Sequence, residues 1–205
     1  KRIAPVAPKI DWPDDNPANG VEGCYAVLNP GSNEPGRRWP FASYVSIAEK
    51  LLEMGWKVMV VGTRAERWDA ALLDDIAKRP GVVDLTGRTS LVELMGLMKN
   101  AGLVISNDTG PAHLSIALGA PTLVIVGGGH FTSFVPYPKN VSPANARFIY
   151  ETMECYHCFW RCHKRSSKHD VFPCVAAIPV DDVWNVCKGL IADEKSAGTQ
   201  SATAG

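Results

Sequence analysis

The sequence predicts an α/β fold in which a parallel β-sheet is covered by helices on both faces. Short apolar runs alternate along the chain with stretches of helical periodicity. The runs show little alternation of polar and apolar residues, which is typical of strands buried on both faces. Five strands are expected, at residues 25–28, 57–61, 82–85, 103–106 and 122–126.

Apolar stripes at helical spacing support the helices between these strands. One stripe lies within residues 41–52 and another within 91–98. Such stripes indicate helix faces that pack on the sheet. Gly55 and Gly119 stand where two helices would end, because glycine adopts the left-handed conformation of a C-terminal cap without steric cost. A last helix is expected over residues 181–191.

The composition is that of an ordinary globular domain. Of 205 residues, 46% are hydrophobic and 20% are charged, and 21 basic residues balance 21 acidic ones. A balanced charge offers no basic surface for nucleic acid. No apolar run approaches the roughly 20 residues of a membrane span. We therefore expect a cytoplasmic protein without a transmembrane segment, with peripheral association at the inner membrane as the alternative location.

The two ends of the chain predict its domain organisation. Residues 1–23 are rich in proline and turn residues and are expected to be an interdomain linker. Residues 24–192 form the predicted ligand-binding domain. Residues 193–205 lack anchoring apolar side chains and are expected to be a disordered tail. A sequence that opens in a linker favours a partner domain upstream.

The most informative motif joins the fourth predicted strand to a helix. Gly110 and Pro111 follow the strand, and proline suits the first turn of a helix because its missing N–H costs nothing there. The unpaired N–H groups and positive dipole end of such a helix attract anions. Asp108, Thr109 and His113 surround this helix start. The motif predicts a site for a phosphorylated small molecule.

Two further strand ends carry charged side chains. Ligands of parallel sheets bind beyond the carboxyl ends of the strands. Arg37 and Arg38 lie in a glycine- and proline-rich loop after the first strand and could clamp phosphate, although paired surface arginines are equally often only solvated. Glu66 lies one turn into the helix after the second strand, where it could accept ribose hydroxyls or simply cap that helix.

The remaining strand ends are less specific. The turn at 86–90 is expected to be structural, with Thr89 or Ser90 capping the next helix. The glycine run at 127–129 allows a ligand or a backbone segment to approach closely. Neither a G-x-G-x-x-G nor a P-loop signature is present, which disfavours an ordinary dinucleotide or P-loop site.

Six cysteines fall into two groups. Four lie within twenty residues, at Cys155, Cys158, Cys162 and Cys174. This spacing can close a tetrahedral thiolate site around zinc or iron, which would stabilise a segment with few aliphatic side chains. Disulfides are the alternative, but a cytoplasmic chain keeps its thiols reduced. Cys24 and Cys187 are expected to be buried free thiols.

Taken together, these motifs resemble those of the heptosyltransferases of glycosyltransferase family 9. The resemblance rests on Asn29-Pro-Gly-Ser with Arg37-Arg-Trp-Pro40, on Gly62 with Glu66, and on Asp108-Thr-Gly-Pro-Ala-His113. Proteins of this family have a GT-B fold of two Rossmann-like halves with the active site between them. The chain is similar to the C-terminal, donor-binding half over about residues 24–192.

The resemblance implies a nucleotide-diphosphate-sugar donor of the ADP-heptose type. The sugar would pass to a lipopolysaccharide core or a protein acceptor, and the transfer would need no cofactor. The implied donor-binding residues are Ser32, Asn33 and Arg37 at the phosphates, Glu66 at the ribose, and Asp108, Thr109, Gly110 and His113 at the diphosphate and sugar. The general base would come from an N-terminal acceptor-binding half, so no catalytic residue is expected in this chain. Some relatives that glycosylate autotransporter proteins carry a cysteine-bound iron.

Two other functions remain open at this point. The chain could be a non-catalytic nucleotide sensor whose cysteine cluster is a zinc-ribbon-like interaction module. It could also be half of a sugar-nucleotide epimerase with the same two-domain architecture. One departure from the family leaves the choice of sugar open, because Gly127-Gly-Gly-His130 stands where many members have Gly-Pro-Thr.

Overall fold

Six parallel strands form one sheet in the computed structural model, which describes residues 6–12, 21, 23–66 and 70–202. The strands are β1 (Tyr25–Asn29), β2 (Lys57–Val60), β3 (Val82–Asp84), β4 (Leu103–Asn107), β5 (Thr122–Ile125) and β6 (Ala146–Ile149). Their order across the sheet is β3-β2-β1-β4-β5-β6, and every pair is parallel. The five predicted strands are confirmed to within one residue at each end.

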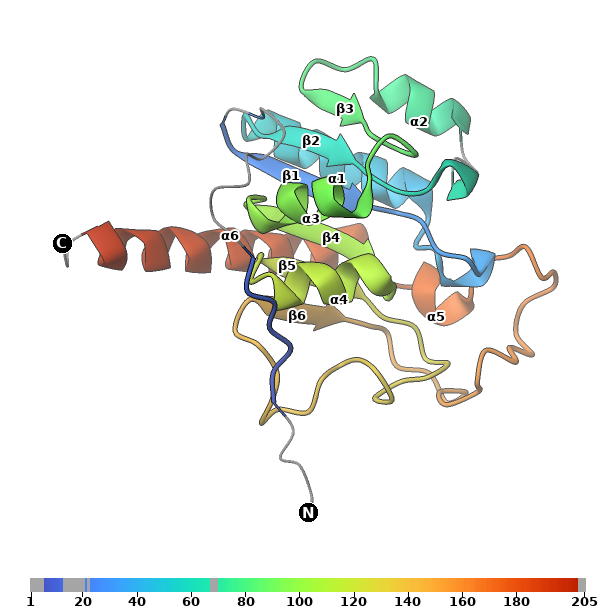
Figure 1. Cartoon of the computed structure of the whole chain (residues 1–205). Helices are drawn as coiled ribbons and strands as arrows, with labels where there is room; N and C mark the ends of the chain where they lie inside the picture. The colour runs from blue at the N-terminus through green and yellow to red at the C-terminus, as the bar shows by residue number, and fades with distance from the viewer. Residues whose placement is uncertain (1–5, 13–20, 22, 67–69, 203–205) are drawn as a thin grey trace.

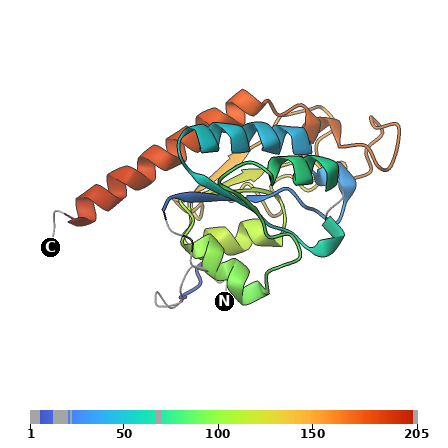
Figure 2. The same ribbon diagram turned by 90° about the horizontal axis from the view of Figure 1, so that it is seen from above.

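Helices cover both faces of this sheet, as predicted (Figures 1 and 2). They are α1 (Phe41–Glu53), α2 (Ala70–Ile76), α3 (Leu91–Lys99), α4 (Gly110–Ala117), α5 (Pro173–Ala176) and α6 (Val180–Ala202), with two 3-10 turns, η1 (Pro35–Arg37) and η2 (Arg64–Glu66). Apolar residues of α1, α2, α5 and α6 pack on one face, and those of α3 and α4 pack on the other.

The side chains of β1 show how the two layers divide. Ala26 and Leu28 face the helices α1 and α6, whereas Tyr25 and Val27 face α3. All five residues of β1 and all five of β4 are buried. Successive side chains of a strand point to opposite faces, so a strand between two helix layers needs apolar residues at every position. The unbroken apolar runs of the sequence have this cause.

The predicted helix boundaries are confirmed where capping residues specify them. The Ser90 hydroxyl accepts a hydrogen bond from Glu93 N at 3.2 Å, and the Glu93 carboxylate accepts one from Ser90 N at 2.7 Å. This reciprocal pair is a capping box. Gly55 and Gly119 follow the last turns of α1 and α4 with φ of +77° and +84°. A side chain at either position would strain the backbone.

Two features of the chain differ from the expectations. Strand β6 was not expected, because it is an edge strand with a charged residue, Arg147, in its middle and only one buried side chain. Residues 193–202 of the expected tail continue α6 as helix in this structure, whereas residues 203–205 lie outside the described residues. Residues up to Ile191 anchor the helix on the sheet. Adding residues to an existing helix costs far less free energy than forming its first turn, so the helix continues beyond the sheet.

The described part of the predicted linker lies against the domain. Ile10 N donates a hydrogen bond to Ala117 O at 2.7 Å, and Ile10, Trp12 and Val21 pack against the layer of α3. The linker assignment for 1–23 stays a prediction, since residues 1–5, 13–20 and 22 lie outside the described residues.

The two cysteines outside the cluster have opposite environments. Cys187 is a buried free thiol on α6, as predicted. Cys24 is also free, but the prediction of burial was wrong: it is exposed, one residue before β1 begins. At that position the chain has not yet entered the sheet, so no helix layer covers the side chain.

Candidate functional site

The carboxyl edge of the sheet contains a hollow between β1, β2 and β4. The helix after β1 covers one face of the sheet and the helix after β4 covers the other, so the chain turns away in opposite directions and leaves a crevice. The hollow is open to solvent and has a volume of about 300 Å³. That volume suits a small-molecule ligand. Its lining consists of Asn29, Ser32, Asn33, Arg37, Thr63, Glu66, Thr109, Gly110 and Pro111.

Two buried asparagines hold the loops around this hollow in place, and one of them, Asn29, belongs to its lining. Asn29 Nδ2 donates a hydrogen bond to Thr109 Oγ1 at 3.1 Å. Asn107 Nδ2 donates to Pro30 O at 2.7 Å, and its Oδ1 accepts from Trp39 N at 3.0 Å. These bonds fasten the loop after β1 to the end of β4. Asn29 belongs to a motif that carries the family resemblance, but neither asparagine was predicted to bind the donor, because an asparagine at the last position of a strand carries no distinctive signal of its own.

The start of α4 opens toward the hollow. Thr109 is its N-terminal cap in extended conformation, but its side chain makes no capping bond to the helix. Its hydroxyl donates to Asn107 O at 3.2 Å instead. Gly110 is exposed at the first helical position. The predicted opening of a helix at Gly110 and Pro111 is therefore confirmed, and its N-terminus faces the same hollow as Arg37.

Arg37, which lines the hollow, is linked to Asp108, His113 and Tyr137 by hydrogen bonds and one longer polar contact. Arg37 Nη2 donates to both the carbonyl oxygen of Asp108 and its carboxylate, at 3.2 Å for Oδ2. His113 Nε2 lies 3.6 Å from Asp108 Oδ1, and His113 Nδ1 shares a 2.7 Å hydrogen bond with the Tyr137 hydroxyl. Burial, and secondly the negative Asp108, raise the pKa of Tyr137. Asp108 and His113 thus lie beside Arg37 rather than on the wall of the hollow.

Arg37 is held from a second side by an aromatic ring. Its guanidinium carbon lies 4.9 Å from the ring centre of Trp160, which is within the range of a cation–π interaction. Arg37 Nε is buried and has no hydrogen-bond partner among the described residues. The guanidinium is therefore oriented by Asp108 and Trp160. Sequence reasoning missed Trp160, which lies 123 positions further along the chain.

Glu66 lines the hollow in the turn that follows β2. Its Oε2 accepts a hydrogen bond from Thr63 N at 2.6 Å, which is a capping contact of η2. A Cβ atom at Gly31 would collide with the Glu66 carboxyl group, so the glycine lets the carboxylate approach the loop after β1. Glu66 therefore both caps its own turn and lines the hollow. The capping role and the ligand-binding role that the sequence suggested for it are compatible.

The four clustered cysteines line a second hollow. It is lined by Cys155, Cys158, Cys162 and Cys174 together with Tyr156, Trp160 and Phe172, among others. All six cysteines of the chain are free. Burial raises the pKa of Cys174. The hydrogen bond that its sulfur accepts from Gly128 N acts in the opposite direction, and the three neighbouring thiols raise the pKa further. Within the described residues, no group of three or more His, Cys, Asp or Glu side chains has the geometry to hold a metal ion.

The cysteine-rich segment, residues 155–174, packs on the loops of the first hollow. His157 N donates to Gly128 O at 2.8 Å, and Phe172 N donates to Gly36 O at 2.7 Å. Arg165 forms a 2.9 Å ion pair with Glu34. Figure 1 shows this segment, in orange, on the side of the sheet to which the strands point. The segment therefore packs on loops beside the site rather than forming a separate module.

Fold and site together define a class of protein. A parallel sheet in this order, with a basic side chain and a helix N-terminus at the point where strand order reverses, is typical of Rossmann-like nucleotide-binding domains. The chain belongs to one such family: the profile of glycosyltransferase family 9 (heptosyltransferase) matches residues 8–165.

Relatives and solved structures agree with this family. Lipopolysaccharide heptosyltransferase 3 of Escherichia coli is 25% identical over 190 residues, which cover 90% of this chain and 52% of that protein. The structure of the E. coli ADP-heptose lipopolysaccharide heptosyltransferase II has a TM-score of 0.66 at 21% identity, covering 84% of this chain and 47% of that one.

A third similar structure is the iron-containing dodecameric glycosyltransferase TibC of enterotoxigenic E. coli. Its TM-score is 0.64 at 18% identity, covering 94% of this chain and 50% of that one. The chain thus spans about half the length of such relatives. None of the helices in the described part of the chain is long and apolar enough to cross a membrane.

Proposed function

We propose that this chain is the C-terminal, donor-binding half of a glycosyltransferase that moves a heptose or related sugar from a nucleotide-diphosphate sugar to a lipopolysaccharide core or protein acceptor. The observation that carries the proposal is the single hollow that joins Arg37, Glu66 and the N-terminus of α4. The relatives named above are heptosyltransferases, which favours transfer over an epimerase or a non-catalytic sensor. An ADP-heptose-type donor is the proposed ligand.

The donor-binding roles follow the positions of the side chains. Glu66 offers a carboxylate that can accept two ribose hydroxyls. Ser32, Asn33 and Arg37 lie beside Thr109 and Gly110, where phosphates would meet both a guanidinium and helix N–H groups. Asp108 and His113 act at one remove, because Asp108 orients Arg37 and His113 joins Asp108 to Tyr137.

Glycosyl transfer needs charge stabilisation at the leaving group. Positive charge develops on the sugar and negative charge on the departing diphosphate as the glycosidic bond breaks. Arg37 and the start of α4 are already oriented toward the position of that diphosphate, so little reorganisation is needed. Such cationic and amide groups replace a metal ion at this step. The general base would come from the N-terminal half, so this chain is expected to bind donor weakly and to transfer nothing.

Calorimetric titration of the 205-residue chain tests the donor site. ADP and ADP-heptose are expected to bind, and UDP-sugars to bind more weakly. Arg37→Ala and Glu66→Ala should each weaken ADP binding roughly tenfold, since hydrogen bonds to charged groups contribute about 1.5–3 kcal/mol. Arg147→Ala and Glu53→Ala are matched controls, because both residues lie away from the hollow and should leave binding unchanged. A wild-type chain that binds no nucleotide contradicts the proposal.

We also propose that the four clustered thiols hold a structural zinc or iron ion. All four thiols line one hollow and are free, and their side chains would have to shift before three of them could reach one ion. A thiolate-bound ion there would stabilise residues 155–174. The similar TibC structure is described as iron-containing, which supports iron as the second candidate.

Elemental analysis of the purified chain tests the metal site. About one equivalent of zinc or iron is expected, lost in Cys155→Ser and retained in Cys24→Ser, whose thiol lies outside the cluster. Absence of both metals together with four unreactive thiols would indicate disulfides instead.

A cytoplasmic location, with peripheral association at the inner membrane, is also a proposal. Fractionation of cells that express the full-length protein tests it.

A further inference from the structure

The cysteine-rich segment carries a local excess of positive charge. Residues 155–169 contain four lysines and arginines, three of the five histidines of the chain, and no aspartate or glutamate, although the whole chain has no net charge. We call residues 161–169 the basic loop, because all four lysines and arginines lie in it. Arg161, Lys164 and Lys168 are exposed, and none of them forms an ion pair with another described residue. Three cations are therefore available to an anionic partner.

Contacts at both ends of the basic loop fix its shape. The fourth cation, Arg165, pairs with Glu34 at 2.9 Å, and its guanidinium carbon lies 4.3 Å from the ring centre of Phe172. Asp170 Oδ2 accepts hydrogen bonds from the backbone N–H groups of residues 166 and 167, at 3.1 and 2.7 Å. Figures 1 and 2 both show part of this segment, in orange, protruding beyond the sheet. The loop thus presents its free cations away from the body of the domain on an anchored support.

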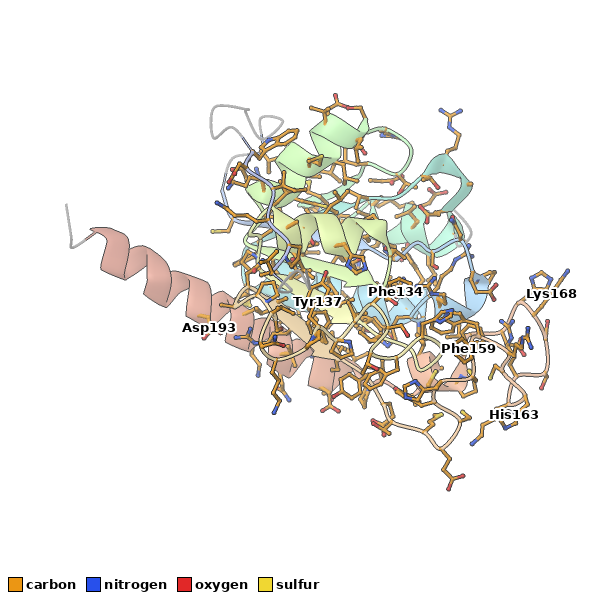
Figure 3. All side chains as sticks on the ribbon, turned by 60° about the horizontal axis from the view of Figure 1, so that its bottom comes forward. Phe134, Tyr137, Phe159, His163, Lys168 and Asp193 are labelled. Carbon is orange, nitrogen blue, oxygen red and sulfur yellow. The ribbon has the colours of Figure 1, made fainter. Side chains whose placement is uncertain are left out.

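Two exposed phenyl rings accompany the basic loop. Phe159 lies two residues before the loop and is 67% exposed, and Phe134 is 62% exposed. The His130 ring connects them, 5.4 Å from the ring of Phe159 and 6.0 Å from that of Phe134. Phe159 has a left-handed backbone with φ of +49°, and its N–H donates to Gly129 O at 3.0 Å, so the fold holds the ring in its exposed position. Figure 3 shows Phe159 and Lys168 on the same side of the molecule.

Cations beside exposed phenyl rings suit the surface of an anionic bilayer. Each lysine or arginine near such a surface strengthens binding about fivefold through attraction to the headgroups, and phenylalanine enters the boundary of the acyl chains. A single signal gives only marginal binding, so stable association takes both. A soluble polyanion would use the cations but would leave the rings in water. A stable protein partner needs roughly 800 Å² on each side, which is more than two phenyl rings supply.

We propose that the basic loop, together with Phe134 and Phe159, is a docking surface for an anionic phospholipid bilayer. The proposal rests on the function proposed above, because an acceptor in a lipopolysaccharide core is attached to lipid. The segment that carries the loop packs beside the donor hollow, where Phe172 N donates to Gly36 O, the neighbour of Arg37. Docking would hold the hollow close to the membrane surface at which such an acceptor lies. The peripheral association proposed above then depends on particular side chains.

Co-sedimentation of the 205-residue chain with vesicles tests this surface. The protein should sediment with vesicles of phosphatidylglycerol and phosphatidylethanolamine and stay in solution with phosphatidylcholine alone. Arg161→Ala and Lys168→Ala should each weaken binding roughly fivefold, and Phe159→Ala roughly tenfold, the effect of withdrawing most of a phenyl ring from the acyl boundary. Lys57→Ala and Met54→Ala are matched controls, because these exposed residues lie at the start of β2 and the end of α1, on the opposite edge of the sheet.

ADP calorimetry on the same proteins separates this surface from the proposed function. The loop variants should keep the wild-type affinity for ADP, because none of their side chains lines the donor hollow. Phe159→Trp keeps an aromatic ring and should keep vesicle binding. If wild-type protein binds ADP but not the anionic vesicles, the docking surface is refuted while the donor site stands. Vesicle binding without nucleotide binding would leave the surface standing and overturn the proposed function. Vesicle binding that heparin abolishes and Phe159→Ala leaves unchanged would assign the loop to a soluble polyanion instead.

Discussion

Replacing Trp160 should weaken nucleotide binding although the ring lies outside the hollow. The residue contacts the Arg37 guanidinium at 4.9 Å, and it also stacks on Phe172 with ring centres 5.1 Å apart. Trp160→Leu keeps an apolar side chain over Phe172 but removes the ring face from Arg37. The variant thus separates the orientation of Arg37 from the packing of the cysteine-rich segment.

The expected magnitude follows from the exposure of the pair. A cation–π contact contributes about 0.5–1 kcal/mol at exposed sites and about 2 kcal/mol when desolvated. The Arg37 side chain is 28% exposed, which places this pair between the two limits. Loss of about 1 kcal/mol corresponds to a roughly fivefold increase in the Kd for ADP. Trp160→Phe should fall between wild type and Trp160→Leu, because phenyl is a weaker cation–π partner than indole.

A double-mutant cycle provides the assay. ADP affinity is measured by calorimetry for wild type, Trp160→Leu, Arg37→Ala and the double variant, with thermal unfolding recorded for each. If Trp160 acts through Arg37, its replacement has no further effect once Arg37 is gone, and the coupling energy equals the single-variant loss. Equal weakening in both backgrounds would refute the orientation of Arg37 by Trp160 and would point to a general loss of structure.

Three other predictions follow from buried contacts. Gly31→Ala should reduce ADP affinity in calorimetry as much as Glu66→Ala does, since the added methyl group collides with the Glu66 carboxylate. Gly189→Ala is the control and should leave binding unchanged, because no atom lies within 4 Å of the added methyl group. Trp39→Ala should lower the free energy of unfolding in urea by about 3–5 kcal/mol, because the ring is fully buried; a loss under 1 kcal/mol would contradict this. Burial raises the pKa of Cys187 from its ordinary value of 9.0 to about 12, so the native thiol stays neutral where the unfolded one ionises. Stability should therefore fall as pH rises from about 9 to 12, and less so in Cys187→Ala, as measured by urea unfolding at each pH.

The fold was largely predictable because its signals are local. A strand covered on both faces needs apolar residues throughout, and β1 and β4 show this as unbroken runs. Ser90 and Gly119 mark helix boundaries by bonds or torsions within a few residues. Strand β6 escaped prediction, since an edge strand is half exposed and tolerates Arg147. The helical tail escaped because its polar composition resembles that of disordered segments.

Much of the lining of the hollow could be named from the sequence, both its charged and its uncharged members. Arg37, Glu66 and Thr109 stand at strand ends, and the order of parallel strands brings such ends to one edge. Asn107 and Tyr137 were missed, since an amide or a phenol in a loop carries no sign of where its side chain turns. Their partners lie 77 and 24 residues away in the chain.

The sequence by itself determined the parallel sheet, the helix start at Gly110 and the gathering of Arg37 and Glu66 at the carboxyl edge of the sheet. These features follow from periodicity, capping and strand order, each of which acts over a few residues or through a general rule of topology. Only the tertiary structure decided that the cysteine-rich segment folds over that edge and places Trp160 on Arg37 and Phe159 beside His130. Those contacts depend on left-handed backbone positions and on packing against the glycines at 127–129. Many weak interactions across the fold impose this backbone conformation together, so no local sequence pattern encodes it.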